Sequence, residues 1–205
     1  MPKMGCITPS RFKDMMSSGR GKDESFGLTA KRYAMELAMN RVCGVTTPDL
    51  EGIKAIDHGN AYEIYAIEAY ELVTISTTIK PVEPIVHPEY DYIAGIPDLL
   101  VDNDGIAEVK CPFNPLNHVG NIIGANQYES LYKYQMQGYL WITDRLWIDF
   151  VSFSDEFTDE YKLSVHRFQR DNDVIDQLEA RCIEFEVLIS EYCDMIRQAA
   201  TTRKM

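Results

Sequence analysis

The feature that most constrains the fold is a tight turn, Asp102-Asn103-Asp104-Gly105, between two short apolar runs. Turns of this composition join antiparallel strands, so the sequence predicts a hairpin over residues 93–111. Because side chains alternate along a strand, Glu108 and Lys110 are expected on one face of that hairpin. The turn also brings Asp98 opposite Glu108, within a residue or two.

Two carboxylates and an ammonium group would then share one patch of sheet. Neighbouring carboxylates repel each other unless a cation lies between them, and hard oxygen ligands favour Mg²⁺ or Mn²⁺. The alternative is an exposed hairpin with a cross-strand ion pair, which stabilises a fold by under ~1 kcal/mol. The apolar residues around Glu108 and Lys110 favour the functional interpretation.

Two further polar residues lie on apolar helix stripes. Glu63 falls at helical spacing with Ala66, Ile67 and Tyr70, and Gln135 falls among aromatic and aliphatic residues on its own helix. A carboxylate on a buried stripe needs a partner or a cation. The alternative for each residue is an ordinary hydrogen-bonded core position.

The remaining pattern predicts one α/β domain over residues 1–205. Thr8-Pro9-Ser10 begins a helix, with Thr8 as the N-cap, and Gly44 ends the next one. The expected helices cover 29–43, 60–72, 127–143 and 171–197, and the expected strands cover 73–86, 146–153 and 161–168, besides the hairpin. Residues 1–45 form a basic helical part, 60–153 a catalytic core and 171–197 a C-terminal helix.

Composition limits the class of protein. The chain carries a net charge of −12, which argues against a uniformly basic nucleic-acid binder, yet residues 1–45 carry +4, with eight basic and four acidic side chains. The five cysteines form no C-x-x-C pair, so free, mostly buried thiols in a reducing cytoplasm are expected. No apolar run approaches the ~18 residues of a membrane span, so no membrane association is expected.

Four sequence blocks carry a resemblance to a known family. They are G-C-I-T-P-S at 5–10, G-N-A-Y-E at 59–63, I-P-D at 96–98 followed by E-V-K-C-P-F at 108–113, and Y-Q-M-Q-G-Y-L-W at 134–141. In this order they resemble the lambda-exonuclease (YqaJ-like) branch of the PD-(D/E)XK nucleases, over most of the chain. The resemblance implies a restriction-endonuclease-like core, a central mixed sheet flanked by helices.

The resemblance also implies residue roles. Asp98 and Glu108 would be metal ligands with the backbone carbonyl of Val109, and Glu63 would complete the shell of one metal. Lys110 would activate the attacking water, supported by Gln135.

On the DNA side, Ser10 would hold a phosphate at a helix N-terminus. Lys3 stands where the family has an arginine for the 5′-phosphate, so it keeps the charge and loses the bidentate fork. Arg20 and Lys22, in a glycine-containing loop, are the next phosphate candidates, or else part of a solvated loop.

The implied activity is Mg²⁺-dependent 5′→3′ degradation of one strand of linear double-stranded DNA to mononucleotides, with Mn²⁺ able to substitute. The implied setting is phage-type recombination in the host cytoplasm, with a ring-shaped trimer and a single-strand annealing protein as partner. Three alternatives stay open: an endonuclease on the same core, a non-catalytic DNA-binding protein, and a hydrolase of small phosphoesters.

Overall fold

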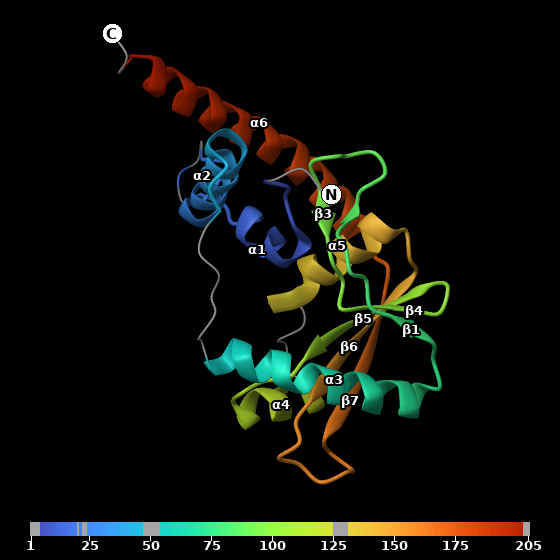
Figure 1. The fold of residues 1–205 in the computed structure, drawn as a ribbon. Helices are drawn as coiled ribbons and strands as arrows, with labels where there is room; N and C mark the ends of the chain where they lie inside the picture. The colour runs from blue at the N-terminus through green and yellow to red at the C-terminus, as the bar shows by residue number, and fades with distance from the viewer. Residues whose placement is uncertain (1–4, 20, 22–23, 47–53, 125–130, 203–205) are drawn as a thin grey trace. The chain divides into compact units, whose positions relative to one another are not determined.

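The computed structural model describes residues 5–19, 21, 24–46, 54–124 and 131–202 (Figure 1). The chain divides into two compact units, each described here by itself. One comprises Met1–Pro48, Pro84–Gly95 and Asp171–Met205, and the other comprises Asp49–Glu83 and Ile96–Arg170.

The first unit is mainly helical. Its elements are a 3₁₀ turn η1 (Pro9–Arg11), α1 (Phe12–Met15), α2 (Leu28–Cys43), the short strands β2 (Ile85–Val86) and β3 (Ala94–Gly95), and α6 (Asn172–Thr202). α6 buries a stripe against this unit, and Phe185 on that stripe meets the rings of Phe26 and Tyr33, each at a centroid distance of 5.5 Å. Arg41 of α2 donates two hydrogen bonds to Glu186 of α6, at 2.5 and 2.9 Å.

The second unit contains the main sheet. Its elements are α3 (Lys54–Thr74), β1 (Thr78–Ile79), β4 (Leu99–Val101), β5 (Gly105–Lys110), α4 (Pro115–Ile122), α5 (Lys133–Thr143), β6 (Trp147–Phe153) and β7 (Leu163–Gln169). The strand order is β1-β4-β5-β6-β7, and only the β5–β6 pair is parallel. Parallel neighbours need a crossover, which α4 and α5 supply here. This mixed sheet flanked by helices confirms the predicted fold class.

The hairpin of β4 and β5 has a fixed register. Leu99 faces Ala107 and Val101 faces Gly105, which places Asp98, just before β4, across from Glu108. Arg145 holds the turn by donating from Nη1 to the carbonyls of Val101, Asp102 and Gly105, at 3.0, 3.2 and 2.6 Å. A Cβ atom at position 105 would lie 2.1 Å from the Trp147 ring, so only glycine fits there.

Each sheet face has its own core. On the α3 face, one cluster joins Ala66 and Tyr70 of the helix to strand residues that include Leu99, Ala107, Val109 and Val151. On the other face, Met136, Tyr139 and Leu140 of α5 pack on Ile106, Ile148 and Phe150. Glu108 alternates with Val109 and therefore shares its face with Ile106, as the hairpin pattern predicted.

Several predicted boundaries were wrong. The expected strand at 73–86 consists of the end of α3 followed by the short strands β1 and β2, which belong to different sheets. Pro81 and Pro84 lie between β1 and β2, and proline cannot donate to a strand ladder. The hairpin is also shorter than 93–111, because residues 94–95 pair with β2.

The helices were predicted more accurately. α2 begins one residue early and ends at Gly44 in the left-handed region, with φ of 67°. The helix expected at 60–72 already begins at Lys54, since Gly59 is accommodated inside it. Of the helix expected from 127 to 143, the structure describes the part that forms α5, because 125–130 lie outside the described residues. The last helix continues past 197 to Thr202. The helix expected at Thr8 begins as a 3₁₀ turn, and the Thr8 side chain makes no capping hydrogen bond.

No helix in the described part of the chain is both long enough and apolar enough to span a membrane.

Candidate active site

Asp98 lies at the point where the chain enters β4. Pro97, the residue before it, has no N–H to donate and separates β4 from the short strand β3. The Asp98 carboxylate turns toward β5, where Oδ2 accepts a hydrogen bond of 2.7 Å from the Val109 N–H. This bond fixes Asp98 beside the strand that carries Glu108 and Lys110.

Glu108 is a buried carboxylate, only 1% exposed. Its Oε1 accepts hydrogen bonds from Lys110 Nζ at 2.5 Å and from Gln135 Nε2 at 2.6 Å. Its Oε2 is buried and has no hydrogen-bond partner among the described residues. Since a buried carboxylate oxygen is costly without a partner, Oε2 has the donor chemistry to accept a cation.

The charges in the site act on one another. Burial, followed by the nearby Glu108 carboxylate, raises the pKa of Asp98 to about 7. Burial by itself would lower the pKa of Lys110, but the Glu108 and Asp98 carboxylates outweigh it and raise that pKa above its ordinary value. Lys110 is therefore held as an ammonium ion, and its Nζ lies 5.4 Å from the centre of the Tyr132 ring.

The pair fits a divalent cation in its donor chemistry. Asp98 and Glu108 offer carboxylate oxygens, the ligand type that Mg²⁺ and Mn²⁺ prefer, and Glu108 Oε2 is left without a protein partner within the described chain. Within the same part of the chain, no three His, Cys, Asp or Glu side chains lie together as a metal-binding group. Asp98 and Glu108 thus present two carboxylates, Glu63 lines the same pocket as Asp98, and further ligands would come from backbone, water or substrate.

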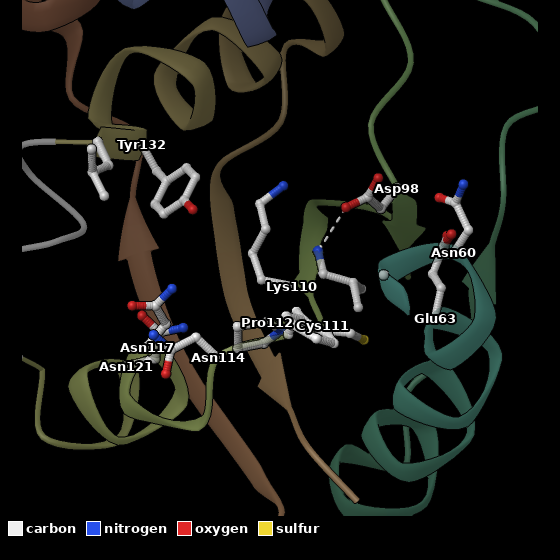
Figure 2. A pocket seen from close by; sticks show the side chains of 14 residues that line it. Asn60, Glu63, Asp98, Lys110, Cys111, Pro112, Asn114, Asn117, Asn121 and Tyr132 are labelled. Carbon is white, nitrogen blue, oxygen red and sulfur yellow. Dashed lines mark hydrogen bonds between the residues drawn. The ribbon is translucent and has the colours of Figure 1, made fainter. Parts of the chain in front are cut away.

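Asp98 and Lys110 line a pocket of about 750 Å³ (Figure 2). Lys110 extends between Asp98 on one side and Tyr132 on the other, and the amides of Asn117 and Asn121 on α4 line another wall. Glu63 and Asn60 of α3 lie beyond Asp98. Glu63 is part of the pocket, but its Oε1 accepts a hydrogen bond of 2.5 Å from Lys80.

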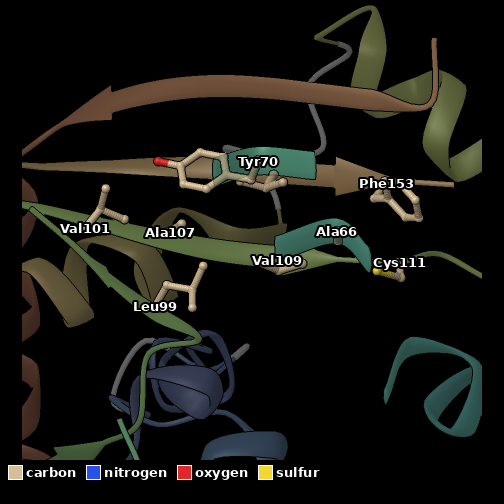
Figure 3. Packing of buried hydrophobic residues seen from close by; sticks show 9 residues of the cluster. Ala66, Tyr70, Leu99, Val101, Ala107, Val109, Cys111 and Phe153 are labelled. Atoms are coloured by element: carbon tan, nitrogen blue, oxygen red, sulfur yellow. The ribbon is translucent and has the colours of Figure 1, made fainter. Parts of the chain in front are cut away.

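α3 is attached to the sheet two turns beyond Glu63. Tyr70 lies in the apolar cluster on this face (Figure 3), and its hydroxyl donates a 2.7 Å hydrogen bond to the buried Asp149 of β6. Arg167 of β7 donates two hydrogen bonds to the same carboxylate, both at 2.8 Å, and stacks 3.5 Å above the Trp147 ring. This network fixes α3, the helix that carries Glu63, relative to β6 and β7.

The structure thus brings Glu108, Lys110 and Gln135 into direct contact and places Asp98 across from Glu108. Two partners were missed from the sequence. Tyr132 stands three residues before Gln135 on the same helical stripe, so its spacing was a usable signal. Lys80, the partner of Glu63, gave no signal, because it comes from an irregular segment.

The predicted phosphate-binding residues belong to the first unit. Ser10 is exposed in η1, and its hydroxyl lies 3.2 Å from that of Thr8. Lys3, Arg20 and Lys22 lie outside the described residues. Of the other basic residues in 1–45, Arg11, Lys31 and Arg41 are engaged in ion pairs with acidic side chains.

The fold and this site define the protein class: an α/β enzyme of the nuclease class, with a central mixed sheet flanked by helices. A sequence profile of the YqaJ-like viral recombinase domain matches residues 3–146. The chain belongs to the YqaJ-like viral recombinase family.

Solved structures agree with this assignment. The fold is similar to that of an alkaline exonuclease, LHK-Exo, from Laribacter hongkongensis, with 26% identity, a TM-score of 0.84, and coverage of 98% of this chain and 95% of that one. A structure of LHK-Exo in complex with dAMP matches with a TM-score of 0.85, the same identity and the same coverage. A phage-related exonuclease from Haemophilus somnus shares the fold at 22% identity, with a TM-score of 0.72 and coverage of 95% and 96%. A comparison with curated proteins found no match.

Proposed function

We propose that this protein is a Mg²⁺-dependent exodeoxyribonuclease that degrades one strand of linear double-stranded DNA. The chain is an enzyme of the nuclease class, with a place in phage-type recombination. The observation that carries the proposal is the placement of Asp98 across from Glu108, with Lys110 and Gln135 both bonded to the Glu108 carboxylate.

Each residue has a role in this proposal. Asp98, Glu108 and the Val109 carbonyl hold the metal ion, with Glu63 available once it leaves Lys80. A divalent cation held there, Mg²⁺, or Mn²⁺ in its place, would supply Lewis-acid chemistry: it would polarise the scissile phosphate and lower the pKa of a water molecule beside it. Lys110 orients that water and stabilises the negative charge that develops on the phosphate oxygens.

Gln135 is a positioning residue. Its amide donates to the oxygen of Glu108 that also accepts from Lys110. It therefore holds Oε1 toward Lys110 and leaves Oε2 for the cation.

The finer features of the reaction are proposed from the family. The direction is 5′→3′ and the products are mononucleotides, with Ser10, Lys3, Arg20 and Lys22 contacting DNA phosphates. Lysine at position 3 is a point charge rather than a bidentate fork, so we expect weaker dependence on a 5′-phosphate than an arginine would give.

The protein acts in the host cytoplasm as a ring-shaped trimer, in partnership with a single-strand annealing protein. A basic lining beneath an acidic outer surface reconciles the net charge of −12 with a DNA substrate.

The test compares matched linear and covalently closed circular duplexes, incubated with Mg²⁺ and either the native protein or Lys110→Ala. We expect the native protein alone to digest the linear duplex and to leave the circle intact. Cutting of the circle would indicate an endonuclease on the same core. Cleavage by folded Lys110→Ala or Glu108→Ala protein would contradict the assigned chemistry.

A further inference from the structure

Four aromatic side chains form a continuous row in the second unit. His58, Tyr62 and Tyr65 lie on successive turns of α3, and Phe113 follows the Glu108-Val109-Lys110 segment by three residues. The ring centroids are 5.5 Å apart for Phe113 and His58, 4.4 Å for His58 and Tyr62, and 6.2 Å for Tyr62 and Tyr65. We call these four residues the aromatic row.

The aromatic row begins at the rim of the catalytic pocket. Phe113 lines that pocket together with Asp98 and Lys110, and so does Gly59, the neighbour of His58. Ring contacts then connect Phe113 with the outer face of α3. A strand whose phosphate lies at the carboxylates would therefore place its adjacent bases beside Phe113.

The two ends of the row, Phe113 and Tyr65, are open to solvent, whereas His58 is half-buried and Tyr62 packs partly against the apolar cluster on the α3 face. Phe113 is 55% exposed and Tyr65 is 56% exposed, whereas Ala66 and Tyr70, on the inner side of the same helix, are fully buried. Aromatic side chains that stay exposed at the rim of a pocket are more typical of a binding surface than of core packing. Ring faces suit nucleobases, because every base has a π-face and stacking does not depend on its hydrogen-bonding edge.

Charge indicates where along the row the DNA lies. The Asp155 carboxylate interacts with the Tyr62 hydroxyl, and Asp155 and Glu68 line the neighbouring groove with Tyr65. These acids repel phosphates at the Tyr65 end. Bases therefore stack best at the Phe113 and His58 end, next to the metal-binding carboxylates.

We propose that the aromatic row is a stacking surface for the nucleobases next to the scissile phosphate. Phe113, at the pocket end of the row, makes the main contact. This inference rests on the proposed nuclease function and deepens it, since it assigns a sequence-tolerant base contact to the same pocket. An enzyme that must accept every base in turn needs a contact of this kind.

The experiment measures stacking without cleavage. A short single-stranded oligonucleotide carrying 2-aminopurine near one end is titrated with protein in EDTA, and its fluorescence is followed. We expect the native protein to quench the 2-aminopurine. Phe113→Leu should remove most of that quenching and weaken binding roughly 5- to 150-fold, the range expected for one lost base stack. Phe113→Trp should restore both.

The matched control is Tyr161→Leu, because Tyr161 is a similarly exposed aromatic of the same unit, 50% exposed, outside the row. This variant should bind and quench like the native protein. Equal binding and quenching by native protein and Phe113→Leu would overturn the proposal, and so would a failure of Phe113→Trp to restore them. Absence of quenching by the native protein would overturn it as well.

The two proposals fail in different ways. A native protein that digests linear DNA, while Phe113→Leu keeps its affinity and quenching, disproves the stacking surface and leaves the nuclease intact. A native protein that stacks bases through Phe113 but cleaves nothing with Mg²⁺ disproves the nuclease alone.

Discussion

The network around Asp149 allows a quantitative prediction about stability. Asp149 is 1% exposed, and its carboxylate accepts hydrogen bonds from Tyr70 and, twice, from Arg167. Arg167 is the cation that compensates this buried charge. Removing it leaves an ionised group in the core with a single neutral donor, whereas removing the Tyr70 hydroxyl leaves the ion pair intact.

Arg167→Met should therefore destabilise the protein by about 3 kcal/mol, the lower end of the range for breaking a buried pair. The lower end applies because the Arg167 side chain is 47% exposed, so water can partly take the place of its guanidinium group once that group is removed. Tyr70→Phe should cost about 1.5 kcal/mol, as for one hydrogen bond to a charged group. For a chain of this size, 3 kcal/mol corresponds to a fall in Tm of roughly 6–12 °C.

Urea unfolding at pH 7, followed by far-UV circular dichroism, measures these free energies. The control is Lys162→Met, which breaks an exposed pair with Asp159 in the same unit and should cost under ~1 kcal/mol. Adding Asp149→Asn to Arg167→Met should recover part of the lost stability, because the uncompensated charge is then gone. The reasoning is refuted if Tyr70→Phe is the more harmful change, or if the double variant is less stable than Arg167→Met.

Three further predictions concern single residues. Gln135→Ala should lower kcat roughly 10- to 100-fold in a linear-duplex assay with little change in Tm, because it loses one hydrogen bond to the Glu108 carboxylate. His87 is buried, its Nδ1 accepts from two backbone N–H groups, and burial lowers its pKa. The stability that His87 contributes is fully present above its unfolded-state pKa of about 6.5 and is lost as the pH falls below that value. Between pH 7 and pH 5.5, the Tm of His87→Asn should therefore drop less steeply than the Tm of the native protein. Cys43 is exposed, whereas burial raises the pKa of Cys111 to about 12, so a thiol reagent should modify Cys43 first, as peptide mapping would show.

The hairpin and the placement of Asp98 across from Glu108 could be predicted from the sequence because the determinants are local. The Asp102–Gly105 turn fixes where the chain reverses, and strand alternation then decides the face of Glu108. The end of α2 at Gly44 was equally accessible, since a left-handed C-cap favours glycine.

Other features depend on distant parts of the chain. The parallel pairing of β5 with β6 joins strands separated by α4 and α5, and neither strand encodes its partner. The pairing of Glu63 with Lys80 depends on where an irregular segment passes. The break in the predicted 73–86 strand was visible in Pro81 and Pro84, but the β-branched residues around them outweighed that signal.

The clamp that Arg145 forms on the 102–105 turn has a consequence for how the protein tolerates insertions and deletions. Loop tips usually accept an extra residue, but the length of this turn fixes the register of the two hairpin strands. One added residue that slipped the register would turn Glu108 and Lys110 together toward the α3 side of the sheet, away from Gln135 on α5. Variation in length should therefore be tolerated in the 154–162 loop and should abolish activity in the 102–105 turn.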